Sequence, residues 1–237
     1  MRGFVPLWLK YSSLKCEYMH SSFYSLFKQS LQTSIDSQYS KLKLSMYSIL
    51  EIVSKQYEFK GIYNPKDNST EVVDKEFDEF QLMLRNYDSY IYYNSLILIG
   101  FSSLESSLKQ ICDFIEKRLE NSEVFEIARN KNIFNQYVIY FLNHVSIIEK
   151  RDFNKIKGEI ERVNKLRNLI VHNNSNLIRK KNILLEKQDN FKILSECKYL
   201  TLMDTGQVFI NNPEYIKSFI LNSKKLLDIM IRSLLPN

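Results

Sequence analysis

The chain has 237 residues, of which 44% are hydrophobic and 13% aromatic, so it can form a sizeable core and is not a disordered polymer. Glycine and proline number only five and four, and such long runs without helix breakers favour a mainly α-helical protein. The formal net charge of +6 favours an anionic partner, with nucleic acid first among the candidates. An AT-biased genome also gives an Asn-, Lys- and Ile-rich chain, so charge alone names no partner.

Cysteine usage and hydrophobic patterning exclude several kinds of site and location. Cys16, Cys112 and Cys197 are far apart and form no Cys-x-x-Cys pair, so we expect reduced, structural cysteines. The apolar patch near the N-terminus breaks at Lys10, which is too early for a signal peptide. The longest nearly apolar run, 90–101, is too short to cross a bilayer of about 30 Å. We therefore expect a cytoplasmic protein with no membrane segment.

The first third of the chain is predicted to be helical. Residues 1–34 keep a helical phase that predicts one or two short helices, and a stronger pattern over 36–57 predicts an amphipathic helix. A turn-rich cluster at 64–69 then marks a boundary. We accordingly divide the chain into an N-terminal helical region, 1–70, and a larger helical domain, 71–237.

The larger domain is predicted to be a helical bundle with a small β-hairpin before its last helix. Apolar residues at helical spacing predict helices over 90–118, 132–144, 150–172 and 211–235. The first of these is apolar almost all round in its first half and should be the most buried. An Asp-x-Gly turn ending at Gly206 lies between β-rich runs, so we place the hairpin around 191–210.

The helix predicted over 150–172 ends in a polar cluster. Arg167 interrupts its apolar stripe, and a guanidinium at that phase needs a polar partner. Asn164, Asn168 and His172 are four residues apart and form a second, polar stripe. The cluster is either a functional site or only a helix end. The Asn-rich run that follows is a good helix stop, and a charged histidine is favoured near a helix C-terminus.

Glu105 is the single charge in a run of small and apolar residues, 102–108, of the predicted central helix. At a buried phase it can pair with a guanidinium, and Arg167 is the partner we expect. The alternative is an ordinary exposed helix glutamate. No Gly-rich phosphate loop, His-Glu-x-x-His or Gly-x-Ser-x-Gly motif is present, so we expect no metal and no cofactor.

Recognisable motifs link this arrangement to a known family. A helix ending in Leu-Arg-Asn-x-x-x-His-Asn follows a long helix with Leu-Glu-x-x-Leu and precedes a hairpin and an Asn-Pro-Glu helix. This order resembles the HEPN superfamily (higher eukaryotes and prokaryotes nucleotide-binding domains). Its hallmark is an arginine, a polar residue and a histidine four to six residues after the arginine, which Arg167, Asn168 and His172 match. The resemblance covers roughly residues 75–235 and leaves the N-terminal third without a match.

The resemblance implies a helical bundle that forms homodimers with two motifs facing each other, and a metal-independent RNA endonuclease. His172 would take the proton from a ribose 2′-hydroxyl, and Arg167 would bind the phosphate. Asn168 would orient the imidazole or hydrogen-bond the phosphate. We assign supporting roles to Glu105, Asn164 and Asn173.

Many bacterial members of this superfamily are toxins or phage-defence effectors, held in check by an antitoxin or defence partner protein. The partners implied are therefore RNA, a second copy of the chain and such a protein. A subgroup carries a tyrosine two residues after the histidine, where this chain has Asn174, which puts silencing through that tyrosine in doubt. Some members of the superfamily are inactive binding or scaffold modules. The alternative function is a non-catalytic helical module that binds RNA, nucleotide or a partner protein.

Overall fold

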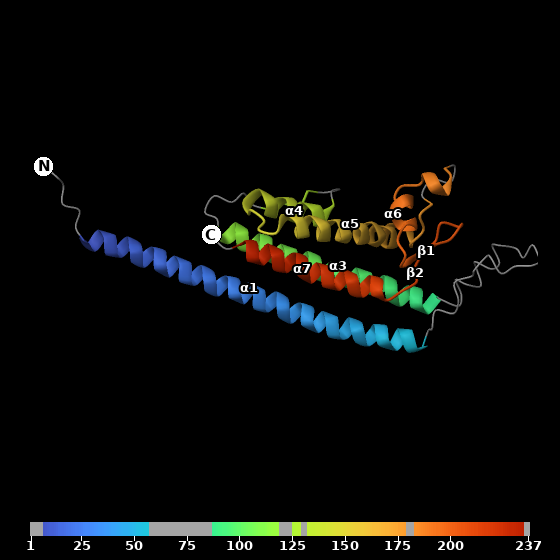
Figure 1. Ribbon diagram of the computed structural model, residues 1–237, viewed down its shortest axis with the longest axis horizontal. Helices are drawn as coiled ribbons and strands as arrows, with labels where there is room; N and C mark the ends of the chain where they lie inside the picture. Colours follow the sequence, from blue (N-terminus) through green and yellow to red (C-terminus); the bar gives the residue numbers. More distant parts are fainter. Residues whose placement is uncertain (1–6, 57–86, 119–124, 129–131, 179–182, 235–237) are drawn as a thin grey trace, which may run out of the picture.

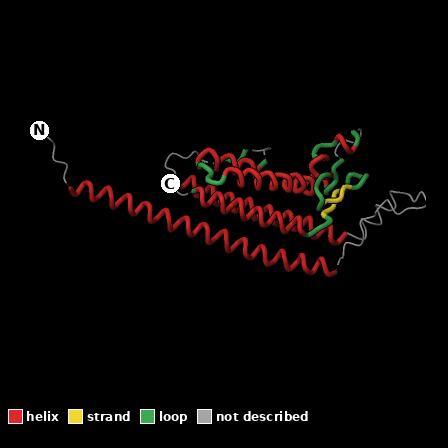
Figure 2. The backbone as a smooth tube through the Cα atoms, in the orientation of Figure 1, coloured by secondary structure: helices red, strands yellow, loops and turns green. Residues whose placement is uncertain are grey.

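The computed structural model describes residues 7–56, 87–118, 125–128, 132–178 and 183–234. Figure 1 and Figure 2 show that this part of the chain is mainly helical, with a small hairpin just before the last helix. The predicted fold class is therefore confirmed.

The elements follow one another as long helices, then two short helices, a hairpin and a final long helix. The α-helices are α1 (Leu7–Gln56), α3 (Tyr87–Arg118), α4 (Ile133–His144), α5 (Lys150–Asn173), α6 (Phe191–Ser195) and α7 (Glu214–Ser233). A single 3-10 turn, η2 (Leu185–Lys187), precedes α6. The strands β1 (Leu200–Leu202) and β2 (Val208–Ile210) pair antiparallel, with Leu200 opposite Ile210.

α1 is one continuous helix, whereas the sequence predicts a break near residue 35. No glycine or proline lies within Leu7–Gln56, so nothing in the backbone forces a stop. Ile35, at the expected break, is fully buried in the core that α1 shares with the other helices. The prediction of separate helices is therefore wrong. The helix continues through the polar residues around Ile35 because Ile35 itself packs into the core of the bundle.

The hairpin is shorter than the predicted range 191–210. Phe191–Ser195 forms α6 and not a strand, and its Leu194 is buried in the core. A short apolar run fits a strand and a helix equally well, so its periodicity could not decide between them. The turn lies where it was expected, because Gly206 has φ +82°, a conformation that glycine adopts most readily.

The core is centred on α3, as its all-round apolar sequence predicts. α3 packs against α1, α4, α5 and α7. Figure 1 shows α3 and α7 side by side, with α1 on one side of them and α4 and α5 on the other. Phe101 of α3 stacks on Phe219 of α7 with ring centroids 5.0 Å apart. The bundle thereby holds α5, which carries the Arg167 motif, against a packed central layer.

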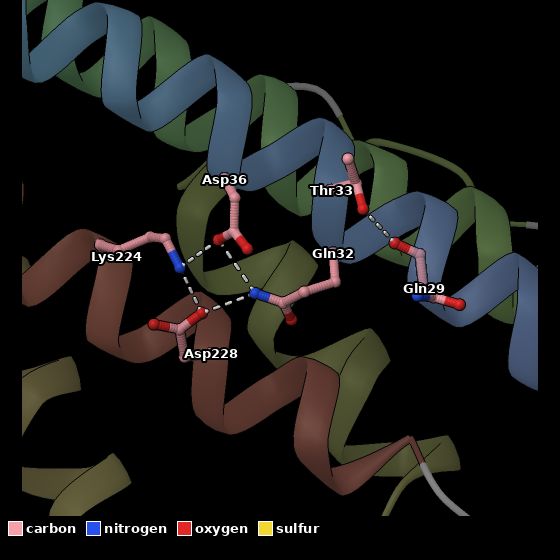
Figure 3. A network of polar contacts seen from close by, with 6 residues as sticks. All are labelled: Gln29, Gln32, Thr33, Asp36, Lys224 and Asp228. Atoms are coloured by element: carbon pink, nitrogen blue, oxygen red, sulfur yellow. Dashed lines mark hydrogen bonds and ion pairs between the residues drawn. The ribbon is translucent and has the colours of Figure 1, made fainter.

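A polar network also fastens α1 to α7 (Figure 3). Lys224 of α7 forms an ion pair with Asp36 of α1 at 2.6 Å and a second with Asp228. The amide of Gln32 donates to both carboxylates, at 3.0 and 3.1 Å. The described part of the N-terminal region thus shares both its core and its polar contacts with the larger domain. The predicted boundary near residue 70 lies outside the described residues.

Candidate functional site

The predicted site lies on the C-terminal half of α5. This helix is amphipathic and buries Phe153, Ile160, Val163, Leu166 and Leu169 against the bundle. It ends at Asn173, and the next residue, Asn174, adopts the left-handed conformation with φ 48°. The N–H groups of Asn174 and Ser175 both donate to the carbonyl of Leu169. The helix therefore stops at the predicted Asn-rich run, with the motif in its last two turns.

Arg167 and Asn168 form a hydrogen-bonded pair. Both side chains are half-buried, and Nη1 of Arg167 donates to Oδ1 of Asn168 at 3.0 Å. An arginine has five N–H groups in a planar fork, so this single bond leaves most of them for an anion. The neighbouring amide limits the directions in which the guanidinium can point.

Glu105 of α3 is the acidic group that acts on Arg167. Its side chain is half-buried, and burial raises the pKa of its carboxyl, while the charge of Arg167 lowers it in part. The two side chains interact through space, but among the described residues Arg167 makes no ion pair within 4.0 Å. Glu105 is thus neither the direct partner we expected nor an ordinary exposed glutamate. The charge of Arg167 favours the ionised form of Glu105 without a direct ion pair between them.

His172 is exposed at the end of α5, one turn after Asn168. Within the described part of the chain, its imidazole makes no hydrogen bond, and the Oδ1 of Asn168 is taken by Arg167. The expected orientation of the ring by Asn168 is therefore not seen in this structure. An exposed imidazole without a bound neighbour can accept a proton from a ligand that approaches the helix end.

The two supporting asparagines lie in structural positions. Asn164 is buried, and its Nδ2 donates to Oδ1 of Asn132, 3.0 Å away. Asn132 caps α4 by accepting from the N–H of Asn135, so Asn164 ties α5 to the start of α4. Asn173 donates to the carbonyl of Asn176 and closes the turn after α5. These contacts give both side chains a role in holding the site's framework.

Residues that sequence reasoning did not select hold the end of the motif in place. The Tyr90 hydroxyl donates to the carbonyl of Asn174 at 2.9 Å, and the Gln207 amide donates to the same carbonyl at 3.0 Å. The amide of Asn94 donates to the hydroxyl of Ser175 at 3.0 Å. Asn94 was visible in the sequence as an amide inside a nearly apolar run. Nothing in the sequence marked Tyr90 or Gln207.

The segment after α5 also pairs with the hairpin. Asn176 forms an antiparallel bridge with Gln207, and the N–H of Leu177 donates to the carbonyl of Gly206 at 2.8 Å. The N–H of Val208 donates to the carbonyl of Ser175 at 2.9 Å. The hairpin therefore fixes where the chain leaves α5, and with it the end of the motif helix.

Comparison with protein-family models, with curated proteins and with solved structures finds no match. Across the described residues there is no group of three or more histidine, cysteine, aspartate or glutamate side chains placed to hold a metal ion. Over the same residues, no helix is both long and apolar enough to cross a membrane.

Proposed function

We propose that the chain is a metal-independent RNA endonuclease of HEPN type, in which Arg167, Asn168 and His172 carry the reaction. The supporting observation is the hydrogen-bonded Arg167–Asn168 pair, half-buried, one turn before an exposed histidine at the end of a fixed helix. An anion-binding fork beside a proton acceptor is the minimum that cleavage of RNA through its own 2′-hydroxyl requires.

In the proposed reaction the neutral imidazole of His172 removes the proton from a ribose 2′-hydroxyl. The 2′-oxygen attacks the adjacent phosphorus, and the bond to the 5′-oxygen breaks to leave a 2′,3′-cyclic phosphate. Arg167 binds the phosphate oxygens and stabilises the charge that grows on them in the transition state. In a two-fold homodimer, His172 of the second copy protonates the departing 5′-oxygen.

The biological role that fits this reaction is a bacterial toxin or phage-defence effector acting in the cytoplasm. The resemblance to HEPN toxins supports it, as does the net charge of +6, which favours binding to an anionic polymer. An antitoxin or defence partner protein would hold such an activity in check.

The test is cleavage of labelled RNA in the presence of a metal chelator, with wild type, His172→Ala and Arg167→Ala. We expect each substitution to lower the rate by at least about a hundredfold, since removal of an acid–base or charge-stabilising group typically costs that much. Arg151→Ala, at the exposed start of the same helix, is the matched control and should cleave like wild type. Equal cleavage by all four proteins, with unchanged helical content, would exclude the proposal.

The second candidate is a non-catalytic module that binds RNA, nucleotide or a partner protein through the same residues. The Arg167–Asn168 bond favours it, because it leaves the His172 ring without the amide that would orient it. This candidate predicts RNA binding with no cyclic phosphate formed, and Arg167→Ala should weaken binding more than His172→Ala. Fluorescence anisotropy with labelled RNA and mass spectrometry of the recovered RNA separate it from the endonuclease.

A further inference from the structure

A cavity of about 370 Å³ lies where α5, α6, β1 and α7 meet. It is separate from the Arg167 motif, although α5 contributes to both. Val163 lines the cavity, and the motif begins about one turn further along the helix, at Arg167. The volume is within the range of roughly 300–1,000 Å³ typical of small-molecule sites.

The walls of this cavity are mainly apolar and aromatic. Two tyrosines from different elements, Tyr199 beside β1 and Tyr215 of α7, line it with ring centroids 6.5 Å apart. The remaining apolar wall is formed by side chains of all four elements: Ile160, Val163, Leu194, Leu200 and Phe219. Such walls favour a flat, largely apolar molecule, because aromatic faces stack and aliphatic groups exclude water.

The Tyr215 hydroxyl is one of the polar groups of the residues that line the cavity. The side chain is 8% exposed, and within the described part of the chain its hydroxyl makes no hydrogen bond. Burial raises its pKa, and Cys197, Glu159 and Arg162, which all line the cavity, act on that pKa as well. Tyr215 lines the cavity, and its raised pKa keeps the hydroxyl protonated as a donor. A ligand with an acceptor atom can receive a hydrogen bond from this hydroxyl.

The charges at the cavity balance. Arg162 and Lys198 are its cations and Glu159 and Glu196 its anions, and Arg162 already contacts Glu159 at 3.3 Å. The Lys198 ammonium lies 4.7 Å from the centre of the Tyr199 ring, in cation–π contact. No net charge is left to attract a charged ligand, so an uncharged one is favoured.

We propose that this cavity binds a small, uncharged, planar heteroaromatic molecule whose acceptor atom receives a hydrogen bond from the Tyr215 hydroxyl. The inference does not depend on RNA cleavage, because none of the residues that line the cavity belongs to the Arg167 motif. It adds a ligand site beside the helix that carries the motif.

Three bicyclic probes of similar shape test the required chemistry: quinoline, which is neutral with a ring acceptor, naphthalene, which has none, and naphthoate, which is anionic. Binding to the full chain is measured by calorimetry or ligand-observed NMR. We expect wild type to bind quinoline most tightly. Tyr215→Phe should weaken the binding of quinoline about three- to tenfold, because it removes one neutral hydrogen bond. It should leave the affinity for naphthalene unchanged.

A second pair of variants tests the location. Ser218 of α7 lines the cavity, so Ser218→Phe should fill it and abolish quinoline binding. Leu221→Phe adds an aromatic ring to the same helix at an exposed position that does not line the cavity, and should bind like wild type. Cys197 also lines the cavity, so bound quinoline should slow its alkylation by iodoacetamide, followed peptide by peptide in the mass spectrometer.

The proposal is overturned if quinoline shows no saturable binding to wild type, or if naphthoate binds as tightly. It is also overturned if Ser218→Phe, with helical content equal to that of Leu221→Phe, still binds quinoline like wild type. Equal affinity of wild type and Tyr215→Phe for quinoline would mean that the Tyr215 hydroxyl does not bond to the ring nitrogen, which contradicts the proposal.

Discussion

The side-chain amide of Asn94 in α3 donates a hydrogen bond to the hydroxyl of Ser175, 3.0 Å away, and both side chains are buried. Ser175 has φ 60° and follows the left-handed residue that ends α5. The central helix thus holds the chain at the point where the motif helix stops. A buried amide in a mostly apolar helix is unfavourable unless it is paired, so this bond explains why Asn94 is tolerated there.

Asn94→Ala should therefore lower the free energy of unfolding by about 1–3 kcal/mol, because it leaves the buried Ser175 hydroxyl without its donor. Urea unfolding, monitored by circular dichroism, measures this loss of unfolding free energy. Ser95→Ala is the matched control, since Ser95 is exposed and, among the described residues, its hydroxyl bonds only to the Ile91 carbonyl of its own helix. Its effect should stay within about 0.5 kcal/mol. Equal effects of the two substitutions would contradict the structural role of Asn94.

Two helical glycines should respond in opposite directions to alanine. A Cβ at Gly100 would lie 2.7 Å from Cε1 of Phe219, whose ring is held by stacking on Phe101. Gly100→Ala should lower the unfolding free energy by about 1–3 kcal/mol through overpacking. A Cβ at Gly158 meets nothing within 4 Å, so Gly158→Ala should raise it by about 0.5–1 kcal/mol. Chemical unfolding of both variants checks the signs, and a loss at Gly158 would be inconsistent with this packing.

The attachment of α1 to α7 should weaken in acid. Burial raises the pKa of Asp36, but hydrogen bonds from Lys224 and Gln32 lower it by more, so its net pKa is below the ordinary 3.8. A carboxyl with a lowered folded pKa stabilises the protein above its unfolded pKa, and this contribution disappears as the pH falls through the folded value. The ion pair should therefore stabilise α1 at neutral pH, and this stabilisation should begin to fall below about pH 3.8 and disappear as the pH passes the lower folded pKa of Asp36.

Lys224→Met tests this pH dependence. At pH 7 it should lower the unfolding free energy by about 0.2–1 kcal/mol, the range for partly exposed ion pairs. The difference from wild type should shrink as the pH falls below 3.8. Lys225→Met, which removes an exposed neighbouring charge, should show no such pH dependence. A Lys224→Met effect that is constant down to pH 2 would rule out the contribution of Asp36.

The sequence allowed the long helices after residue 86 to be predicted close to their observed bounds, because each has a continuous apolar face and a recognisable end. α4 begins after Asn132, and α5 ends at the Asn-rich run. The unbroken α1 and the helical α6 were missed for a shared reason. The local sequence pattern does not show whether a helix continues through a polar stretch because of its packing in the bundle. It also does not show whether a short apolar run is buried as a helix or as a strand.

The candidate site was predictable in its residues and less so in their contacts. Spacing alone placed Arg167, Asn168 and His172 on the last turns of one helix. It could not show that Asn168 would bond to Arg167, because the rotamers of neighbouring helical side chains are decided by what surrounds them. Nor could it show that Asn164 would face the α4 cap while His172, two turns along the same stripe, would be exposed. Over eight residues the side-chain direction turns by about 80°, because the helix has 3.6 residues per turn, so His172 does not share the face of Asn164.

The last prediction concerns Glu105 and its charge. Burial raises the pKa of Glu105, and Arg167 lowers it only in part. A carboxyl whose folded pKa is above its unfolded pKa destabilises the protein when ionised, and this cost disappears as the pH falls below the unfolded value. Glu105→Gln should therefore raise the unfolding free energy at pH 7, and the gain should shrink towards pH 4. The exposed Glu186→Gln is the control and should change stability little at either pH.

The Arg167→Ala background tells whether the two charges interact. Without the guanidinium, ionised Glu105 is more costly, so Glu105→Gln should gain more in Arg167→Ala than in wild type, by at least about 0.5 kcal/mol. Urea unfolding of the wild type, the two single variants and the double variant gives this coupling energy directly. If Glu105→Gln gains the same stability in both backgrounds, Arg167 does not act on Glu105, and the bond to Asn168 is the contact that the structure gives the half-buried guanidinium among the described residues.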